Sequence, residues 1–360
     1  MKKLISKMKR QKKTAKPTRI TNETVAEHRE RILAGGRRFK YPVQYTKHRL
    51  VLTALAIGFA VLTLFLGVSW WLLYKTQTTD EFYYRITRVV PLPVAKVDGE
   101  YVRYGDYLLN YKMSETYLNT AEKANEAQYA GGGDNESVYD FYKAQAMQNA
   151  VTDTYAQKLA DRYDIEITDE RIDEAIKALI QTSSGQADIS QDVIDRSVEQ
   201  LYGLSPSENR YYLRESLLRQ TVAYEVDEVA QKATDEIKKI LDKDPTRDLA
   251  VIAQQYAKSA DAQVLTSGWV NRDNKDGGLA VAASNLKDGE ITGPIKPLSG
   301  DGYYFVKLLD TNSDGEINYQ FIKVPLKEFT QQIENLKEDG KVEYFISVPE
   351  TKSRVQNQTK

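Results

Sequence analysis

The sequence predicts an α+β protein with one membrane-spanning helix. Three observations support this fold class. A run without charged residues extends from Leu50 to Tyr74. Residues 136–230 then contain apolar side chains at helical spacing, and Tyr303–Leu308 alternates as a strand with one buried face does. The uncharged run is long enough to cross a bilayer core of roughly 30 Å at 1.5 Å per residue.

The flanks of the uncharged run predict its orientation. Residues 1–49 contain 16 Lys and Arg against 3 Asp and Glu, whereas the rest of the chain contains 34 against 48. The positive-inside rule therefore places residues 1–49 in the cytoplasm and residues 75–360 outside. Trp70 and Trp71 stand at the outer end, where aromatic anchors are typical. The run is too long for a cleaved signal peptide and no small-residue cleavage site follows, which predicts an uncleaved signal-anchor.

The chain has no cysteine and only two histidines, His28 and His48, both on the predicted cytoplasmic side. Disulfides, thiolate metal sites and cysteine nucleophiles are excluded. Serine–histidine triads and ordinary zinc sites are excluded from the exported part, because it has no imidazole. We therefore expect no metal and no cofactor. Motifs for nucleotide, dinucleotide or hydrolase chemistry are also missing from the sequence.

The composition divides the chain into six parts. The basic first part is expected to be disordered and to fix topology. A tail that grips anionic lipid or nucleic acid is the alternative, but no interleaving of aromatic and basic residues favours nucleic acid. The expected parts are a basic tail 1–49, the span 50–74, a linker 75–93, a helical domain 94–233, an α/β domain 234–348 and a polar tail 349–360.

Local signals place the first elements of the exported part. Val94–Tyr111 predicts two short strands joined at an Asp98–Gly99 turn and followed by a helix. Thr168 is a predicted N-cap, and Ser205–Glu208 has the pattern of a capping box with proline at the first helical position. The helix that this box opens is expected to include Leu213 and Leu217, and its continuation past Asp235 is left open.

Three of these segments resemble a known domain when taken in order. They are "VDGEYVRYGDY", "LADRYDIEITDERIDEAI" and "LYGLSPSENRYYLRESLLRQTVAYEV". The series is similar to the N-terminal helical chaperone domain of SurA-like and PrsA-like folding factors over about residues 94–230. The resemblance implies a helical domain that holds unfolded polypeptides.

The next segments, within residues 234–310, resemble a parvulin (PpiC-type) prolyl isomerase domain. They are "DLAVIAQQYAKS", "SGWV", "NLKDGEITGPI" and "GYYFVKLLD". The family opens with a histidine-bearing strand, and no such strand precedes the helix here. A four-stranded antiparallel sheet needs its central strand, because its neighbours otherwise lose their ladder partners. We therefore predict that Asn318–Val324 fills this position from the C-terminal side, as in a circular permutant.

The parvulin resemblance assigns candidate site residues but no catalytic residue. Gln320 and Tyr304 take the two histidine positions, and Lys275 and Leu279 take those of a pocket Met and Phe. If the strand is permuted, Gln320 and Tyr304 should face each other beside a pocket. The candidates for peptide binding in and around that pocket are Gln320, Tyr304, Leu279, Phe305, Trp269 and Phe321.

A second motif, "DTNSDGEI" at Asp310–Ile317, matches the opening of a calcium loop. The twelfth position of such a loop needs a bidentate glutamate, and here it is Phe321. We predict a turn between two strands instead of a metal site.

These observations lead to one favoured function and two alternatives. The favoured one is a membrane-anchored extracytoplasmic folding factor that binds unfolded, newly exported polypeptides, with a weakly active or inactive parvulin-like domain. The second is an active prolyl isomerase with an altered site. The third is a structural subunit of a cell-envelope complex. Expected partners are unfolded polypeptides and a single membrane, without nucleic acid or metal.

Overall fold

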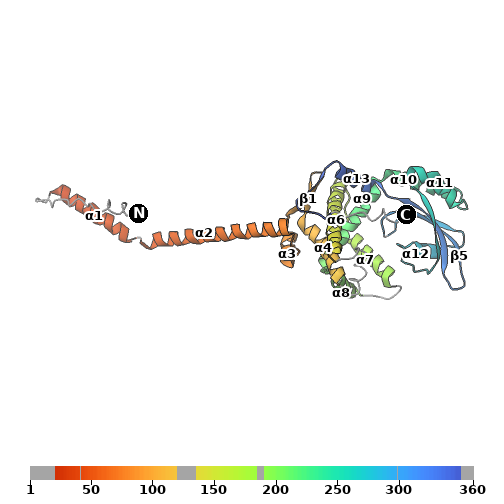
Figure 1. Ribbon diagram of the computed structural model, residues 1–360, viewed down its shortest axis with the longest axis horizontal. Coiled ribbons are helices and arrows are strands. Elements are labelled where there is room, and N and C mark those ends of the chain that lie inside the picture. Colours follow the sequence, from red (N-terminus) through yellow and green to blue (C-terminus); the bar gives the residue numbers. More distant parts are fainter. Residues whose placement is uncertain (1–20, 41, 120–134, 185–189, 298, 350–360) are drawn as a thin grey trace. The chain divides into compact units, whose positions relative to one another are not determined.

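The structure is a computed structural model that describes residues 21–40, 42–119, 135–184, 190–297 and 299–349. The chain divides into two compact units, Met1–Leu73 and Tyr74–Lys360. Each unit is described by itself below, with the labels of Figure 1.

The first unit contains a helix where the sequence predicted disorder. This helix, α1, spans Asn22–Lys40. Thr21 and Thr24 form its entry, since the amide of Thr21 donates to Thr24 Oγ1 at 3.0 Å and that hydroxyl donates to the Thr21 carbonyl at 2.8 Å. Such local bonds satisfy groups that would otherwise lack partners at a helix start. The structure thus has a helix over part of the predicted tail 1–49, while residues 1–20 lie outside the described part.

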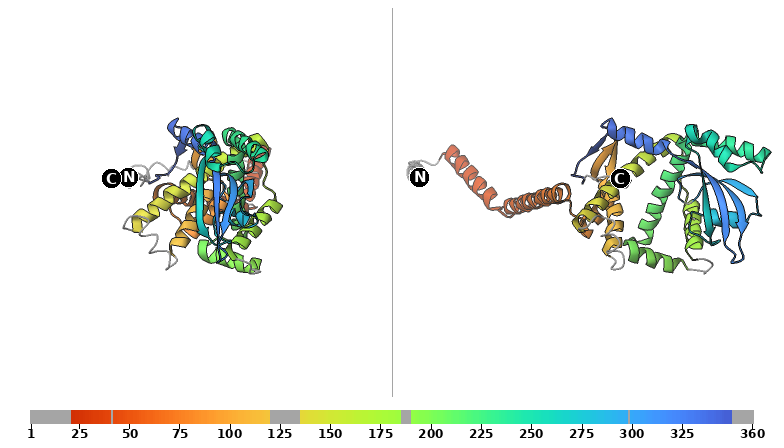
Figure 2. Two further views of the ribbon diagram at one scale, coloured as in Figure 1. Left: turned by 90° about the vertical axis from the view of Figure 1, so that its right-hand side faces the viewer. Right: turned by 45° about the vertical axis from the view of Figure 1, so that its right-hand side comes forward.

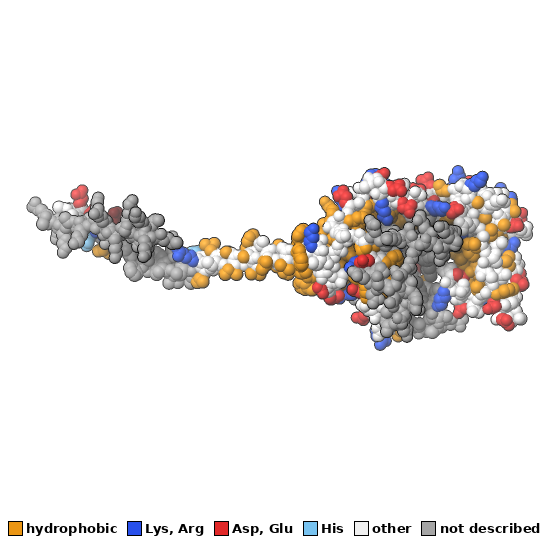
Figure 3. Space-filling model, in the orientation of Figure 1, with side chains coloured by type: hydrophobic (Ala, Val, Ile, Leu, Met, Phe, Trp, Pro, Cys, Tyr) orange, Lys and Arg blue, Asp and Glu red, His pale blue; other side chains and the backbone are white. Residues whose placement is uncertain are grey.

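Helix α2 spans Pro42–Trp71 and contains the uncharged run as far as Trp71. The stretch His48–Thr76 is long and apolar enough to cross a membrane, and none of its most apolar window is buried by protein. Figure 3 shows hydrophobic side chains along its whole length. The hydroxyls of Thr53 and Thr63 donate to helix carbonyls at 2.9 Å, which satisfies them without water. A single-turn π-helix, η1, follows at Leu72–Thr76.

The second unit begins with helices in the region predicted as a linker. Residues 75–93 include α3, which buries Tyr83, Tyr84 and Thr87, so the linker prediction is wrong there. These side chains pack on later helices, which sequence periodicity over nine residues could not show. The helical layer consists of α3 Glu81–Val89, α4 Tyr104–Asn119, α6 Asn135–Tyr163, α7 Asp169–Ser184, α8 Gln191–Tyr202 and α9 Pro206–Val226.

A three-stranded antiparallel sheet packs beside these helices. Its hairpin, β1 Pro93–Val97 and β2 Glu100–Arg103, is the one that the sequence predicted. Asp98 and Gly99 have φ of 45° and 96°, the left-handed conformation that a tight hairpin turn requires. The third strand, β7 Val342–Tyr344, comes from the C-terminal end and pairs with β1. Figure 2 shows this strand, in dark blue, beside the orange hairpin.

The helix that starts at the capping box stops earlier than its apolar pattern suggests. The reciprocal Ser205–Glu208 capping bonds are present, as predicted. Helix α9 ends at Val226, and Asp227 turns the chain into α10, Glu228–Lys243. The Asp227 carboxylate accepts from the amides of Ala230 at 2.9 Å and Lys327 at 2.7 Å. The contact with Lys327, which is far away in the sequence, stabilises the turn at Asp227 between the two helices. The segment from the capping box past Asp235 is therefore two helices and not one.

A four-stranded antiparallel sheet forms the rest of the unit, in the order β3-β6-β5-β4. The central place of β6 agrees with the prediction for Asn318–Val324. Helices α10 and α11 cover one face and α12 covers the other, so β5 is buried on both faces and not on one as the alternation suggested. The elements are α11 Leu249–Ala260, β3 Gln263–Val270, α12 Leu279–Ser284, β4 Ile291–Ile295, β5 Gly302–Thr311 and β6 Ile317–Pro325.

The chain then returns to the helical layer through α13, Glu328–Glu338. Phe329 of α13 stacks on Tyr155 of α6 with ring centroids 6.1 Å apart, and the Tyr155 hydroxyl donates to Gln332 at 2.9 Å. Residues 228–325 are thus an insertion between α9 and α13, and the predicted 234–348 boundary is wrong at its C-terminal end. Residues 350–360, the predicted polar tail, lie outside the described part.

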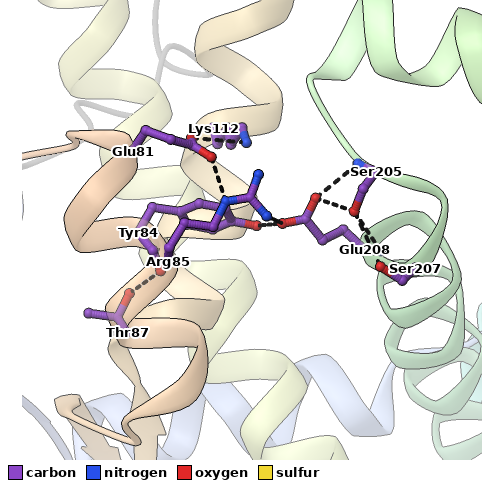
Figure 4. Close-up of polar contacts among 8 residues, drawn as sticks. All are labelled: Glu81, Tyr84, Arg85, Thr87, Lys112, Ser205, Ser207 and Glu208. Atoms are coloured by element: carbon purple, nitrogen blue, oxygen red, sulfur yellow. Dashed lines mark hydrogen bonds and ion pairs between the residues drawn. The ribbon is translucent and has the colours of Figure 1, made fainter.

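A polar cluster joins the first helix of this unit to the start of α9 (Figure 4). The hydroxyl of Tyr84 donates to Glu208 Oε1 at 2.5 Å, and Glu208 Oε2 accepts from the amide of Ser205 at 2.8 Å. Glu81 bonds Arg85 at 2.6 Å and Lys112 at 3.2 Å nearby. The glutamate of the α9 capping box therefore also holds α3 against the helical layer.

Candidate functional site

The predicted pocket residues fall on two opposite faces of the four-stranded sheet. Tyr304 lies with Leu279 and Phe321 on the face that α12 covers. Phe305 lies on the other face, against α10 and α11. Adjacent residues of a strand point to opposite sides, so Tyr304 and Phe305 cannot line one pocket.

The pairing of β5 with β6 also separates the two residues at the family's histidine positions. Tyr304 lies opposite Lys323, whereas Gln320 lies opposite Lys307, which puts Gln320 on the face of Phe305. The predicted facing of Gln320 and Tyr304 is therefore wrong. An odd shift in strand register moves a side chain to the other face, and a count along the sequence cannot fix register to one residue.

Trp269 lies on the same face of the sheet as Phe305 and Gln320. It lies opposite Asn318, the neighbour of Tyr319, and is 47% exposed. Since Tyr319 belongs to the α12 face, Trp269 lies on the other one. The structure thus brings together Tyr304, Leu279 and Phe321, and it separates them from Gln320, Phe305 and Trp269.

A charged network lies beside Tyr304 on the α12 face. The Tyr304 hydroxyl donates to the two carboxylate oxygens of Asp301 at 3.1 and 3.0 Å, and Lys323 forms an ion pair with the same carboxylate. Burial acts to raise the pKa of Asp301, but the bonds from Lys323, Ser299 and Tyr304 outweigh it and the pKa is lowered. Burial raises the pKa of Tyr304. The network therefore offers fixed donors to a carbonyl but no acid or base that titrates near pH 7.

Asp276 holds α12 on this face of the sheet. It accepts a short hydrogen bond from Tyr319, and its two oxygens accept from the amide of Ala280 at 3.0 and 3.2 Å. A carboxylate at the start of α12 satisfies amides that have no partner within the helix. The bond to Tyr319 then holds α12 over the sheet, where Leu279 and Ala280 are buried.

The turn at Asp310–Ile317 has the structure of an Asx turn. Asn312 Oδ1 accepts from the amides of Asp314 at 3.0 Å and Glu316 at 2.9 Å. Side-chain oxygens that would have to face a cation are thus engaged with the backbone. In the described ranges, no group of three or more His, Cys, Asp or Glu side chains could hold a metal ion.

The sequence did not predict the main cleft of the second unit. A cavity of about 560 Å³ lies among α7, α9, α10 and the segment between β4 and β5. The residues that line it include both apolar and charged side chains. Apolar groups come from Ala175, Leu217, Tyr224, Pro294, Pro297 and Tyr303, and charged groups from Arg171, Glu174, Glu225, Asp235 and Lys296.

Two tyrosines form the rigid wall of this cleft. Tyr224 and Tyr303 meet edge to face with ring centroids 5.0 Å apart, and the Tyr224 hydroxyl donates to the Gly302 carbonyl at 2.7 Å. The ammonium of Lys296 lies 4.6 Å from the centroid of the Tyr224 ring. These contacts join α9 to β5, so the wall is preorganised by both the helical layer and the sheet.

One side chain of the cleft has an unsatisfied polar atom. Thr234 on α10 is 2% exposed, and its hydroxyl has no hydrogen-bond partner among the described residues. An unpaired buried hydroxyl costs about 1–3 kcal/mol. A bound molecule that supplied a hydrogen-bond partner to the Thr234 hydroxyl would remove this cost.

A second, polar cavity of about 360 Å³ lies between β2, α4, α6 and α9. Asp153 pairs with Arg219 at 2.5 Å, and Glu215 lies close to both Asp153 and Asp106. Burial raises the pKa of Asp153 to about 6, and burial with repulsion from Asp153 raises the pKa of Glu215 to about 7. Glu215 and Arg219 share a helix face at a four-residue spacing, which is the signal that sequence reasoning missed.

Comparison with known proteins does not assign the chain to a family. No family model matches the sequence, and no curated protein matches it either. The candidate site therefore stands on the geometry of the cleft and of the α12 face.

Proposed function

We propose that this protein is a membrane-anchored extracytoplasmic folding factor that holds unfolded segments of exported polypeptides in the cleft of the second unit. The cleft carries the proposal. Its rigid tyrosines, prolines and aliphatic groups suit sequence-tolerant contact with apolar side chains, and its charged rim suits backbone and polar groups. A volume of about 560 Å³ accommodates a few residues of an extended chain.

The location follows from the long apolar helix and the charges around it. Positive charge is concentrated before Leu50, which favours a cytoplasmic N-terminus and an exported second unit. The order of helical motifs, similar to SurA-like and PrsA-like folding factors, supports the same function. The central position of β6 supports a permuted parvulin-like sheet.

A binding assay with the full chain in lipid nanodiscs tests the proposal. Thr221 lines the cleft from an exposed position on α9, so Thr221→Arg fills the cleft without disturbing the core. We expect the wild-type chain to suppress aggregation of a chemically unfolded client, and this variant to lose most of that activity. Thr330→Arg, at an exposed helical position on α13 outside the cleft, is the matched control. Equal suppression by both variants, or none by the wild type, would contradict the proposal and favour a structural subunit.

Prolyl isomerisation at the α12 face is the second candidate function. The donors of Lys323 and Tyr304 converge on Asp301 beside Phe321, and a ligand carbonyl there could accept from the same donors. A peptide isomerisation assay on wild type and Tyr304→Phe separates this activity from holding. A rate equal to the uncatalysed one would exclude it and leave the first proposal intact.

A further inference from the structure

The first helix of the second unit exposes an apolar stripe. Phe82 is 57% exposed and Val89 is 82% exposed, seven residues further along α3 and on the same side of the helix. The opposite side buries Tyr83, Tyr84 and Thr87 against the helical layer. Burial in the core therefore explains one side of α3 only.

Aromatic side chains on the three-stranded sheet are exposed in the same way. Tyr101 on β2 is 63% exposed, and Phe345, just after β7, is 38% exposed. Their ring centroids lie 6.4 Å apart. Lys96 on β1 lies opposite Tyr101, with its ammonium 5.6 Å from the ring centroid. This outer face thus combines aromatic rings with a lysine.

Short backbone contacts connect the stripe to the sheet. Val90, 45% exposed, ends α3, and its carbonyl accepts from the amide of Leu92 at 2.8 Å. The amide of Phe345 donates to the carbonyl of Val94 at 3.0 Å. The end of the stripe at Val90 is therefore four residues before Val94, the residue that binds the backbone of Phe345. We call Phe82, Val89, Val90, Tyr101 and Phe345 the collar surface.

The collar surface is close along the chain to the end of the long apolar helix. The hydroxyl of Tyr74 donates to the Pro93 carbonyl at 2.7 Å, and the amide nitrogen of the Gln77 side chain donates to the Ser347 carbonyl at 3.0 Å. Tyr74 is three residues beyond Trp71, a distance of about 10 Å at most in an extended chain. The interfacial layer of a bilayer is itself about 5–8 Å thick on each side.

We propose that the collar surface rests in the interfacial layer of the same bilayer that the apolar helix crosses. This inference rests on the proposed span. Exposed aromatic rings and aliphatic side chains with a lysine beside them are the groups that partition to lipid headgroups, where the ring or stem is buried and the polar end stays wet. The proposal gives the second unit two attachments to the membrane, the apolar helix and the collar surface. Two attachments restrict the orientation of the unit more than the helix alone would.

Site-directed spin labelling of the full chain in phosphatidylcholine nanodiscs tests this. The chain has no cysteine, so single substitutions give unique labels. Val89→Cys and Phe345→Cys report on the collar surface. Val251→Cys and Val281→Cys, at positions 46% and 51% exposed on α11 and α12, are matched controls. Leu62→Cys reports on the span itself. Far-UV circular dichroism of each variant confirms its fold.

The measured quantity is the accessibility of each label to oxygen, which concentrates in lipid, relative to a water-soluble nickel chelate. We expect the oxygen-to-nickel ratio at positions 89 and 345 to lie between that of the controls and that of position 62. Ratios at 89 and 345 equal to the controls, with a lipid-like value at 62, would overturn the collar proposal alone. Labels at 89 and 345 shielded from both reagents would assign the surface to a contact with a second copy of the chain and also overturn it. A water-like value at 62 would overturn the span, and the collar proposal with it.

Discussion

The hydroxyl of Tyr84 donates a 2.5 Å hydrogen bond to Glu208, the glutamate of the capping box that starts α9. One carboxylate therefore serves two elements that are 124 residues apart. Its side chain is only 9% exposed, and the oxygen that accepts from Tyr84 also lies 3.6 Å from Arg85 Nη1. Loss of the Tyr84 hydroxyl therefore leaves this buried oxygen with a long ion pair in place of a short hydrogen bond. This relationship makes α3 part of the folded unit.

Replacement of Tyr84 by phenylalanine tests how much this contact contributes. We expect Tyr84→Phe to lower the free energy of unfolding by about 1–3 kcal/mol, because the ring packing is kept and the hydrogen bond to a charged group is lost. Urea denaturation followed by circular dichroism measures the change. Tyr163→Phe, at a tyrosine 46% exposed, is the control and should change stability by less than about 0.5 kcal/mol. Equal effects in both variants would contradict the prediction.

Glu208 also predicts an acid limit of stability. Burial acts to raise its pKa, but hydrogen bonds from Ser205 and Tyr84 outweigh burial and lower the pKa from 4.5 to about 2. The contribution of the carboxylate is complete above the ordinary pKa and is lost as pH falls toward 2. We expect the slope of unfolding free energy between pH 4.5 and 2 to be smaller in Glu208→Gln. Parallel curves for variant and wild type would refute this.

Glu215 predicts the opposite trend near neutral pH. Burial, with repulsion from Asp153 and Asp106, raises its pKa from 4.5 to about 7. The folded state therefore binds a proton that the unfolded state releases, and stability falls as pH rises through this window. We expect Glu215→Gln to match the wild type near pH 4.5 and to exceed its melting temperature above pH 7. A variant that is less stable at every pH would show that the carboxylate has a structural partner.

Thr234→Val separates a structural role from a binding role in the cleft. The substitution removes a buried hydroxyl without a described partner at nearly constant volume, so we expect stability to rise by about 1–3 kcal/mol. Client binding should weaken if the hydroxyl gains its partner from the bound polypeptide. Thermal unfolding and a client-binding titration measure the two effects. A destabilised variant would mean that the hydroxyl is already satisfied in solution.

Truncation tests the central place of β6. A chain that ends at Asp310 lacks the strand between β3 and β5, so we expect the four-stranded sheet to unfold. A chain that ends at Lys327 keeps this sheet but loses α13 and β7, and it should weaken the helical layer instead. A chain that ends at Pro349 is the control. An unchanged melting transition after truncation at Asp310 would overturn the assignment.

We expect the rate of prolyl isomerisation at the α12 face to depend little on pH. Residues 75–360 contain no histidine or cysteine. Around Tyr304, the pKa of the tyrosine is raised and that of Asp301 is lowered, so both move away from neutrality. We expect a nearly constant rate between about pH 5 and 8, measured by a peptide assay. A bell-shaped profile centred near pH 7 would indicate a titrating group elsewhere, with Glu215 the first to examine.

Several features were determined by the sequence alone because their causes are local. The turn at Asp98–Gly99 needs left-handed backbone, and the capping box at Ser205 needs side chains three residues apart. The apolar helix follows from composition over a long window. The central position of Asn318–Val324 was predicted from the resemblance to the parvulin strand pattern, whose opening strand is missing here, together with the need of its neighbours for a ladder partner.

Other features were decided by the tertiary structure because their causes are distant in the sequence. Tyr304 and Gln320 lie on opposite faces through a register that packing on both sides of β5 sets, and one residue of slip reverses a face. Asp227 ends α9 by binding the amide of Lys327, a hundred residues later. The cleft exists only where α9 meets β5, so no single segment encodes it. Local patterns specify elements, whereas register and clefts depend on which surfaces are buried together.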